Sequence, residues 1–358
     1  MAYTFASSRL RVSDDPEALM RLAEAEGFGD GLPLVPPTPE RVAAMLDGAG
    51  RDPGEVLGRL APSWKQATVE KVAINAVMAG CRPEYFPVVL AAVEAVADPA
   101  FNLQSIQATT HICTPLVIVN GPIRKALGIN CGHNCFGQGT RANATIGRAL
   151  RLTLLNVGGA APGEGDKATF GQPGKYSYCT GENEEANPWE PLHVERGFAP
   201  DQSTVTVIGA EAPHNVNDHG STTGDGILMT VSSGLATAAC NHVYLEGEPL
   251  VVFGPEHAAT IARDGFTKAD VKRFIFEHAR VPIARISPGN REWFKGIRPA
   301  WFSDPRDDVE VPMTGSPEDI MVVVAGGAGK HSLVIPTFAK TRAVTRVIRP
   351  GPCLRLTA

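Results

Sequence analysis

The amino-acid sequence of 358 residues predicts an α/β protein, with a mixed α+β N-terminal part and an α/β C-terminal layer. Residues 68–81 carry apolar side chains at intervals of three and four, the spacing of a helix that is buried on one face. The apolar runs at 115–119 and 204–209 have the length of buried strands. Residues 250–325 then alternate between strand-like and helix-like segments, which is the pattern of an α/β layer.

Turn and capping signals set the bounds of the predicted elements. Thr38 is placed as an N-cap before Pro39, and Thr267 and Asp270 have the spacing of a capping box. We predict helices at 15–26, 39–46, 68–81, 84–96, 142–155, 255–263 and 267–280, and strands at 115–119, 204–209, 250–253, 281–286 and 320–325. Residues 227–239 fit a helix or a strand. The predicted units are an N-terminal helical and loop segment (1–64), a main α+β domain (65–245) and a C-terminal α/β domain (246–358).

Composition and charge narrow the class of protein. The chain has 33 Lys and Arg against 38 Asp and Glu, a net charge of -5, so it lacks the basic character expected of a partner of nucleic acid or of an anionic membrane. It has no run of about 18 uncharged apolar residues, and no apolar stretch of signal-peptide length at its N-terminus. The seven cysteines are odd in number and unevenly spaced, which favours reduced thiols or metal ligands in a cytoplasmic protein.

A cluster of cysteine and histidine residues is the main candidate for a metal site. His111 and Cys113 are two residues apart, as are Cys131, His133 and Cys135 in turn. Residues two apart project to the same side of an extended backbone, so we expect all five side chains to lie within reach of one point. Thiolate and imidazole ligands suit a transition metal such as Fe, Zn, Cu, Ni or Co.

Other readings of this cluster stay open. A structural zinc ion is one, because four Cys or His ligands close a tetrahedron and leave no open position. A second interpretation is that the cluster binds no metal. In a third, Cys131 and Cys135, or Cys113 with either of them, form a reversible disulfide, and His133 lowers the pKa of a thiol.

Two segments are candidates for substrate binding. Arg141 and Asn143 follow a glycine-rich loop at the start of a predicted helix, where unpaired backbone N–H groups favour an anion. Lys330 and His331 follow the glycines at 326–329, directly after a predicted strand, a position where open α/β sheets bind ligands. An ordinary loop with a solvated arginine, and a tight turn, are the alternatives.

Two further loops carry candidate catalytic groups. Glu182 and Glu184 lie in the long irregular stretch 161–198 and offer carboxylates for acid–base chemistry. His214, Asp218 and His219 lie in a loop that leaves a predicted strand, where they could bind a metal or hold a base. Solvated surface charges are the alternative for both loops.

Several blocks of the sequence resemble the large segment of the UGSC family of (seleno)proteins. The blocks are DGLPLVPPT (30–38), NAVMAGCRPEY (75–85), RANATIGRALRL (141–152), GQPGKYSYC (171–179), ENEEANPWEPLHVERGF (182–198) and VVVAGGAGKHS (322–332). That family is named for a selenocysteine-Gly-Ser-Cys motif in a fused or neighbouring small domain. Neither UGSC nor CGSC occurs in this chain, so the resemblance implies that such a redox centre is absent or lies on another chain. The cysteines at 113, 131 and 135 are not part of the family pattern.

These observations lead to the prediction of a small-molecule metalloenzyme with a Cys/His-ligated transition metal. The expected chemistry is redox or bond cleavage of the lyase or hydrolase type on a small polar or anionic substrate. The alternatives are a thiol-based oxidoreductase that works with a small redox partner protein, and a non-catalytic scaffold subunit. We also expect a homo-oligomer.

Overall fold

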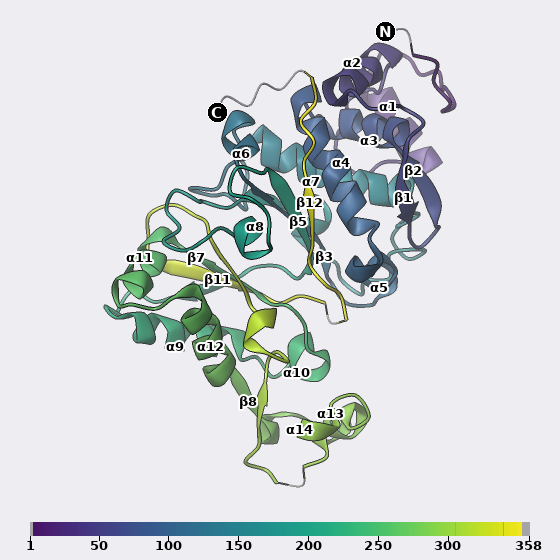
Figure 1. The fold of residues 1–358 in the computed structure, drawn as a ribbon. Helices are drawn as coiled ribbons and strands as arrows, with labels where there is room; N and C mark the ends of the chain where they lie inside the picture. The colour runs from purple at the N-terminus through teal and green to yellow at the C-terminus, as the bar shows by residue number, and fades with distance from the viewer. Residues whose placement is uncertain (1–2, 305, 339, 353–358) are drawn as a thin grey trace.

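Two four-stranded sheets form the centre of the protein, and helices cover the outer face of each sheet (Figure 1). This arrangement is seen in a computed structural model, which describes residues 3–304, 306–338 and 340–352. The combination of helices with sheets of mixed strand direction confirms the predicted α/β class.

The first sheet has the strand order β12-β5-β3-β4. Every residue of β3 and β5 is buried, and the two strands pair antiparallel from Thr114↔Ala210 to Asn120↔Thr204, which confirms both predicted strands. Strand β4 lies parallel to β3 at one edge, and β12 lies antiparallel to β5 at the other. The bounds are β3 (Thr114–Asn120), β4 (Cys179–Gly181), β5 (Thr204–Ala210) and β12 (Val344–Val347).

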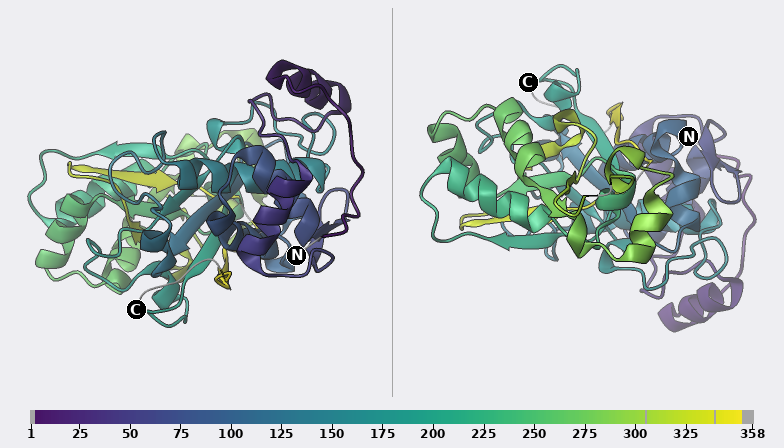
Figure 2. Two further views of the ribbon diagram at one scale, coloured as in Figure 1. Left: turned by 90° about the horizontal axis from the view of Figure 1, so that it is seen from above. Right: turned by 90° about the horizontal axis from the view of Figure 1, so that it is seen from below.

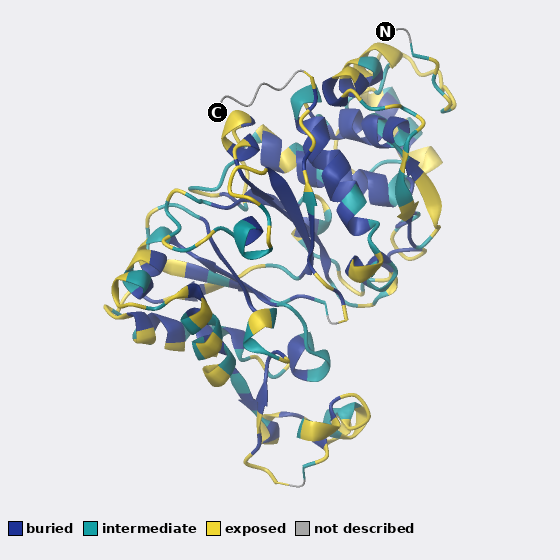
Figure 3. Cartoon of the chain, viewed as in Figure 1, coloured by how far each residue is buried: buried dark blue, intermediate teal, exposed yellow. Residues whose placement is uncertain are grey.

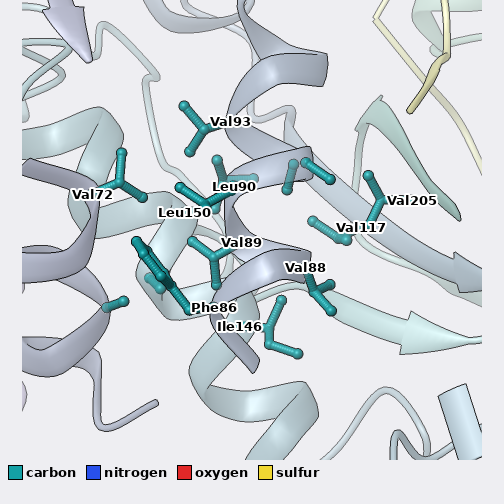
Figure 4. Close-up of a cluster of buried hydrophobic side chains, with 14 of the residues drawn as sticks. Val72, Phe86, Val88, Val89, Leu90, Val93, Val117, Ile146, Leu150 and Val205 are labelled. Carbon is teal, nitrogen blue, oxygen red and sulfur yellow. The ribbon is translucent and has the colours of Figure 1, made fainter. Parts of the chain in front are cut away.

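A group of four helices packs on the outer face of the first sheet, with α4 at its centre (Figure 4). Ten of the 11 residues of α4 are buried, as expected for a helix that is apolar on all sides. Its Leu90 belongs to the same apolar cluster as Val117 and Val205 of the sheet and Leu150 of α7. The bounds are α2 (Pro39–Ala49), α3 (Val69–Ala79), α4 (Phe86–Val96) and α7 (Arg141–Asn156), close to the predicted ones.

The second sheet has the order β10-β7-β11-β6, and helices α9, α11 and α12 cover its outer face. Strands β7 and β10 are parallel, whereas β11 is antiparallel to both of its neighbours. Thr267 and Asp270 form the predicted capping box at the start of α12, and α9 resolves the ambiguous segment as a helix. The bounds are β6 (His214–Asn217), β7 (Leu250–Phe253), β10 (Met321–Val324), β11 (His331–Ile335), α9 (Gly224–Leu235), α11 (Pro255–Arg263) and α12 (Lys268–His278).

The inner faces of the two sheets pack against each other. Side chains along a strand point alternately to its two faces. In β3, Val117 and Val119 join the helix-side core, whereas Leu116 and Ile118 join the cluster that also contains Val323 of β10. Helices, sheet, sheet and helices therefore form four successive layers, and strands β3, β5, β7 and β10 are buried along their whole length (Figure 3).

The layers do not follow the predicted domain boundaries. Strand β12, from the predicted 246–358 domain, completes the first sheet, and β6 with α9, from the predicted 65–245 domain, belong to the second layer pair. The predicted strand at 281–286 is shorter, because Ile283–Arg285 turn into a 3₁₀ helix after β8. The part of the chain with β8, β9, α13 and α14 projects from the second half (Figure 1), and it faces the viewer when the protein is seen from below (Figure 2, right).

The remaining elements are shorter or peripheral. They are α1 (Pro16–Glu26), α5 (Leu103–Ala108), α6 (Ile123–Ala126), α8 (Leu192–Glu195), α10 (Asn241–Leu245), α13 (Pro288–Phe294), α14 (Pro299–Phe302), β1 (Val56–Leu60), β2 (Lys65–Thr68), β8 (Arg280–Pro282) and β9 (Glu310–Pro312). Within the described residues no single helix is long and apolar enough to cross a membrane. The bent helix pair 83–96 and 99–108, with an angle of 71°, meets the length and composition criteria only when taken together.

A buried histidine ties α10 to the chain that leaves β11 and makes stability depend on pH. The side chain of His242 is fully buried, and its Nε2 accepts a hydrogen bond from the Thr337 N–H at 2.8 Å. Burial lowers the pKa of His242 from 6.5 to about 4. The neutral ring is therefore the form that the fold favours, and its contribution is present above pH 6.5 and lost as the pH falls through 4.

We expect the free energy of unfolding to fall by about 3 kcal/mol from this group alone between pH 6.5 and pH 4. Urea denaturation at a series of pH values measures this loss. In the variant His242→Asn, the slope of the free energy of unfolding against pH should be smaller in this range by the contribution of one bound proton. An unaltered slope in His242→Asn would show that another group causes the loss of stability at acidic pH.

Candidate functional site

The carboxyl ends of β3, β4 and β10 meet at one edge of the two-sheet core, and polar side chains gather there. At this edge the N–H of Glu182 donates to the Val119 carbonyl, and the N–H of Asn183 donates to the Val324 carbonyl at 2.7 Å. The segment that follows β4 therefore joins the ends of both sheets. Loops at the carboxyl ends of parallel strands are where α/β proteins hold functional groups.

A thiol and a guanidinium are in direct contact at this edge. Nη1 of Arg124, on the short helix α6, lies 3.2 Å from Sγ of Cys131 and donates a hydrogen bond to it. The Arg124 side chain is only 4% exposed, whereas Cys131 is partly exposed. Gly181 makes room for this contact, because a Cβ there would lie 2.8 Å from Cδ of Arg124 and 3.3 Å from Cβ of Cys131. A buried guanidinium and a partly exposed cysteine are therefore in direct contact.

Carboxylates fix the arginine in place. Nη2 of Arg124 donates to both oxygens of Glu185, at 2.7 and 3.0 Å, and lies 3.6 Å from Glu184. Burial alone would lower the pKa of Arg124, but these carboxylates and the Cys131 sulfur outweigh it and raise that pKa. For Glu185, burial alone would raise the pKa of the carboxyl, but the bonds to Arg124 and Lys125 lower that pKa to about 2. Both partners are therefore charged at neutral pH.

Glu182 and Glu184 are held by hydrogen bonds rather than exposed for acid–base chemistry. Glu182 is fully buried and accepts from Nδ2 of Asn120 at 2.6 Å, Nδ2 of Asn187 at 2.8 Å and the Leu192 N–H at 2.9 Å. Burial raises the pKa of its carboxyl. Glu184 accepts from Nδ2 of Asn120 and, at 2.7 Å, from the Gly121 N–H. The pair organises the turn that carries α6 and Arg124.

Two glycine-rich loops, one from each half of the protein, pack together beside Cys131. The Gly326 N–H donates to the Cys131 carbonyl at 2.9 Å. A Cβ on Gly327 would lie 1.9 Å from Nδ1 of His133, so a residue with a side chain cannot replace this glycine without moving the imidazole. Asn143 holds the first loop through bonds to the Asn130 N–H and carbonyl and to the Cys135 carbonyl. Asn143 therefore positions the loop.

The second loop leads to a pair of histidines. Nε2 of His219 and Nε2 of His331 are 3.2 Å apart, and Lys330 reaches the His219 carbonyl at 3.4 Å. His214 is exposed on β6, whereas Asp218 accepts from the Ser221 N–H at 2.9 Å and from Thr230 at 2.7 Å. Of the predicted His/Asp group, only His219 therefore faces the loop at 326–331.

The five residues predicted to share a metal lie in two separate places. His111 and Cys113 are at the opposite end of the seven-residue strand β3 from Cys131, and strand β3 itself is the reason, because it carries the chain across the sheet. Nε2 of His111 contacts Oε1 of Glu211 at 2.8 Å, and Sγ of Cys113 is buried near the Ile106 carbonyl.

Among the described residues no group of three or more His, Cys, Asp or Glu side chains is placed to hold a metal ion. The five residues therefore do not fit one shared metal, and no step below is derived through one. Metal binding by some of these residues stays a prediction.

Arg141 and the other cysteines serve the structure. Nε and Nη2 of Arg141 donate to the Gly80 carbonyl at 3.0 and 2.9 Å, so this arginine caps helix α3. Burial raises the pKa of Cys135, and of Cys81, Cys113 and Cys240 to about 12. Cys131 is the one cysteine with partial exposure in the part of the chain that the structure describes.

Arg124 is the functional candidate that sequence reasoning missed. It comes just after the turn formed by Asn120, Gly121 and Pro122 and lies seven residues before Cys131. That spacing does not identify a site by itself. The turn was visible in the sequence, and a cation after it was the available signal. No protein-family model, curated protein or solved structure matches this chain.

Proposed function

We propose that the protein is an enzyme that acts on a small polar or anionic molecule through the thiol of Cys131. The observation that carries the proposal is the contact of 3.2 Å between Arg124 Nη1 and Cys131 Sγ at a partly exposed position. Cysteines next to a positively charged group, with access to solvent, are the ones that react as nucleophiles. The other described cysteines are buried.

The neighbouring loop supplies donors for an anionic substrate. Within the described part of the chain, the backbone N–H groups of Gly327, Ala328 and Lys330 have no hydrogen-bond partner. Unpaired N–H groups of a glycine-rich loop form a concave site for an anion. In the proposed reaction, the Cys131 thiol gives its proton to water, and its sulfur forms a bond to an electrophilic atom of a substrate that this loop orients. The bond to the leaving group breaks, and the leaving group departs with the electron pair and takes up a proton from water. A second water molecule then hydrolyses the bond to sulfur and restores the free thiol.

We expect the variant Arg124→Lys to react about tenfold more slowly at Cys131 with iodoacetamide at pH 7, because a lysine ammonium does not reproduce the planar guanidinium donor. Peptide mass spectrometry measures the rate at Cys131 in native protein. The matched control is Arg141→Lys, which changes the arginine directly after the first loop, whose guanidinium donates to the Gly80 carbonyl.

Equal rates in the wild type and Arg124→Lys would contradict the proposal. An equal decrease of the labelling rate at Cys131 in Arg124→Lys and Arg141→Lys would assign the effect to the loop, and it would also contradict the proposal. Circular dichroism of both variants checks that each one is folded during the labelling.

A further inference from the structure

A cavity of about 700 Å³ lies beside β12 and β10, which are edge strands of the first and the second sheet. Helices α8 and α12 border it, and in Figure 1 α8 stands between the two halves. Leu192, Phe198, Met321 and Val344 give it apolar walls. This volume falls in the range of sites for small organic molecules, which often form between two halves of a protein.

Buried positive charges line the interior of this cavity. Lys268 has a side chain only 3% exposed and lies 2.6 Å from Glu195, which also contacts Lys272. Burial would raise the pKa of Glu195, but the two lysines outweigh it and lower that pKa, so the carboxylate is charged. Two ammonium groups around one carboxylate leave one positive charge in excess.

Arg196 is a third cation in the lining, and it has no carboxylate partner among the described residues. Arg196 donates from Nε to Oγ1 of Thr345 at 2.6 Å and from Nη2 to the Ala343 carbonyl at 2.7 Å. Both acceptors are neutral, so the guanidinium charge is not offset, and its Nη1 keeps donors for a ligand.

The other charged groups of the lining are paired or exposed. Arg346 pairs with Asp98, and Glu248 pairs with Arg342 at 3.0 Å. Glu190 and Glu318 also line the cavity, but both are exposed, so solvent screens their charges more than that of the buried Lys268. The cavity therefore combines apolar walls with two lysines that share the Glu195 carboxylate and an arginine that has no carboxylate partner, and such groups attract an anion.

We propose that this cavity binds a small organic anion, with a carboxylate or phosphate group held by Lys272 and Arg196 and an apolar body against the walls. The site is separate from the thiol of Cys131, and the proposal does not depend on the proposed function.

Isothermal titration calorimetry of the full chain tests this with 2-naphthoate, 2-naphthyl phosphate and the uncharged 2-naphthalenemethanol. We expect one site for at least one of the anions, and at least about tenfold weaker binding of the alcohol. Preference between the two anions identifies a carboxylate or a phosphate ligand.

Two variants act on different features of the site. Lys272→Met should weaken anion binding by about tenfold, and Ala269→Trp, at an exposed lining position, should fill the cavity and abolish binding. The matched controls are Lys65→Met and Ala259→Trp, exposed residues outside the lining, which should bind as the wild type does. No binding of either anion, equal affinity for the alcohol, or unchanged affinity in both lining variants would overturn the proposal.

Discussion

Replacement of Cys131 by serine is expected to slow thiol labelling of the native protein by about 100-fold. The other five described cysteines are buried, and burial raises the pKa of each of them, so they react only when the structure opens. The measurement is the rate of reaction with iodoacetamide at pH 7, resolved by peptide. Cys353 lies outside the described residues, so the comparison is made in a Cys353→Ser background.

The variant Cys135→Ser is the control for this result, because it removes a buried thiol from the same loop. It should retain the fast reaction at Cys131. A fast reaction that persists in Cys131→Ser, or that disappears in Cys135→Ser, would mean that Cys131 is not the reactive group.

The variant Glu182→Ala is expected to lower the free energy of unfolding by about 3 kcal/mol or more. The substitution leaves three N–H donors without an acceptor inside the protein: those of Asn120, Asn187 and Leu192. Urea denaturation at pH 7 measures the loss. Asn120 also holds Glu184, so we expect the turn before Arg124 to loosen in the same variant.

Two comparisons make this second result specific. Glu182→Gln keeps the volume and one acceptor oxygen, so it should lose less stability than Glu182→Ala. Glu190→Ala changes an exposed residue of the same loop and should change stability by less than about 0.5 kcal/mol. A loss below about 1 kcal/mol in Glu182→Ala would show that water replaces the carboxylate.

Local patterns predicted the long elements of the fold well. The continuous apolar run of β3 and the periodicity of α3 and α12 are strong signals, because each element buries its own repeating side chains. The hairpin of β1 and β2 was missed, since it lies at the surface and only part of it is buried.

Sheet membership could not be read from local pattern. Strand β12 pairs with β5 across more than 130 residues of chain, and such pairing depends on packing in three dimensions. The predicted domain boundaries followed the order of the chain for this reason and separated strands that share a sheet.

The candidate site shows the same limit. Cys131 was recognised by its residue type, but the strand spacing that grouped it with His111 and Cys113 ignored the length of the strand between them. The role of Arg124 depends on the turn at Gly121, where a φ of 82° reverses the chain, and on the small size of Gly181. Both are packing effects that no fixed spacing records.

The most direct test of the proposed thiol centre is the second-order rate constant of Cys131 with iodoacetamide at pH 7, compared with that of glutathione under the same conditions. The contact with Arg124 predicts that Cys131 reacts at least about tenfold faster than the free thiol of glutathione. A rate equal to or below that of glutathione would contradict an activated thiol at this position.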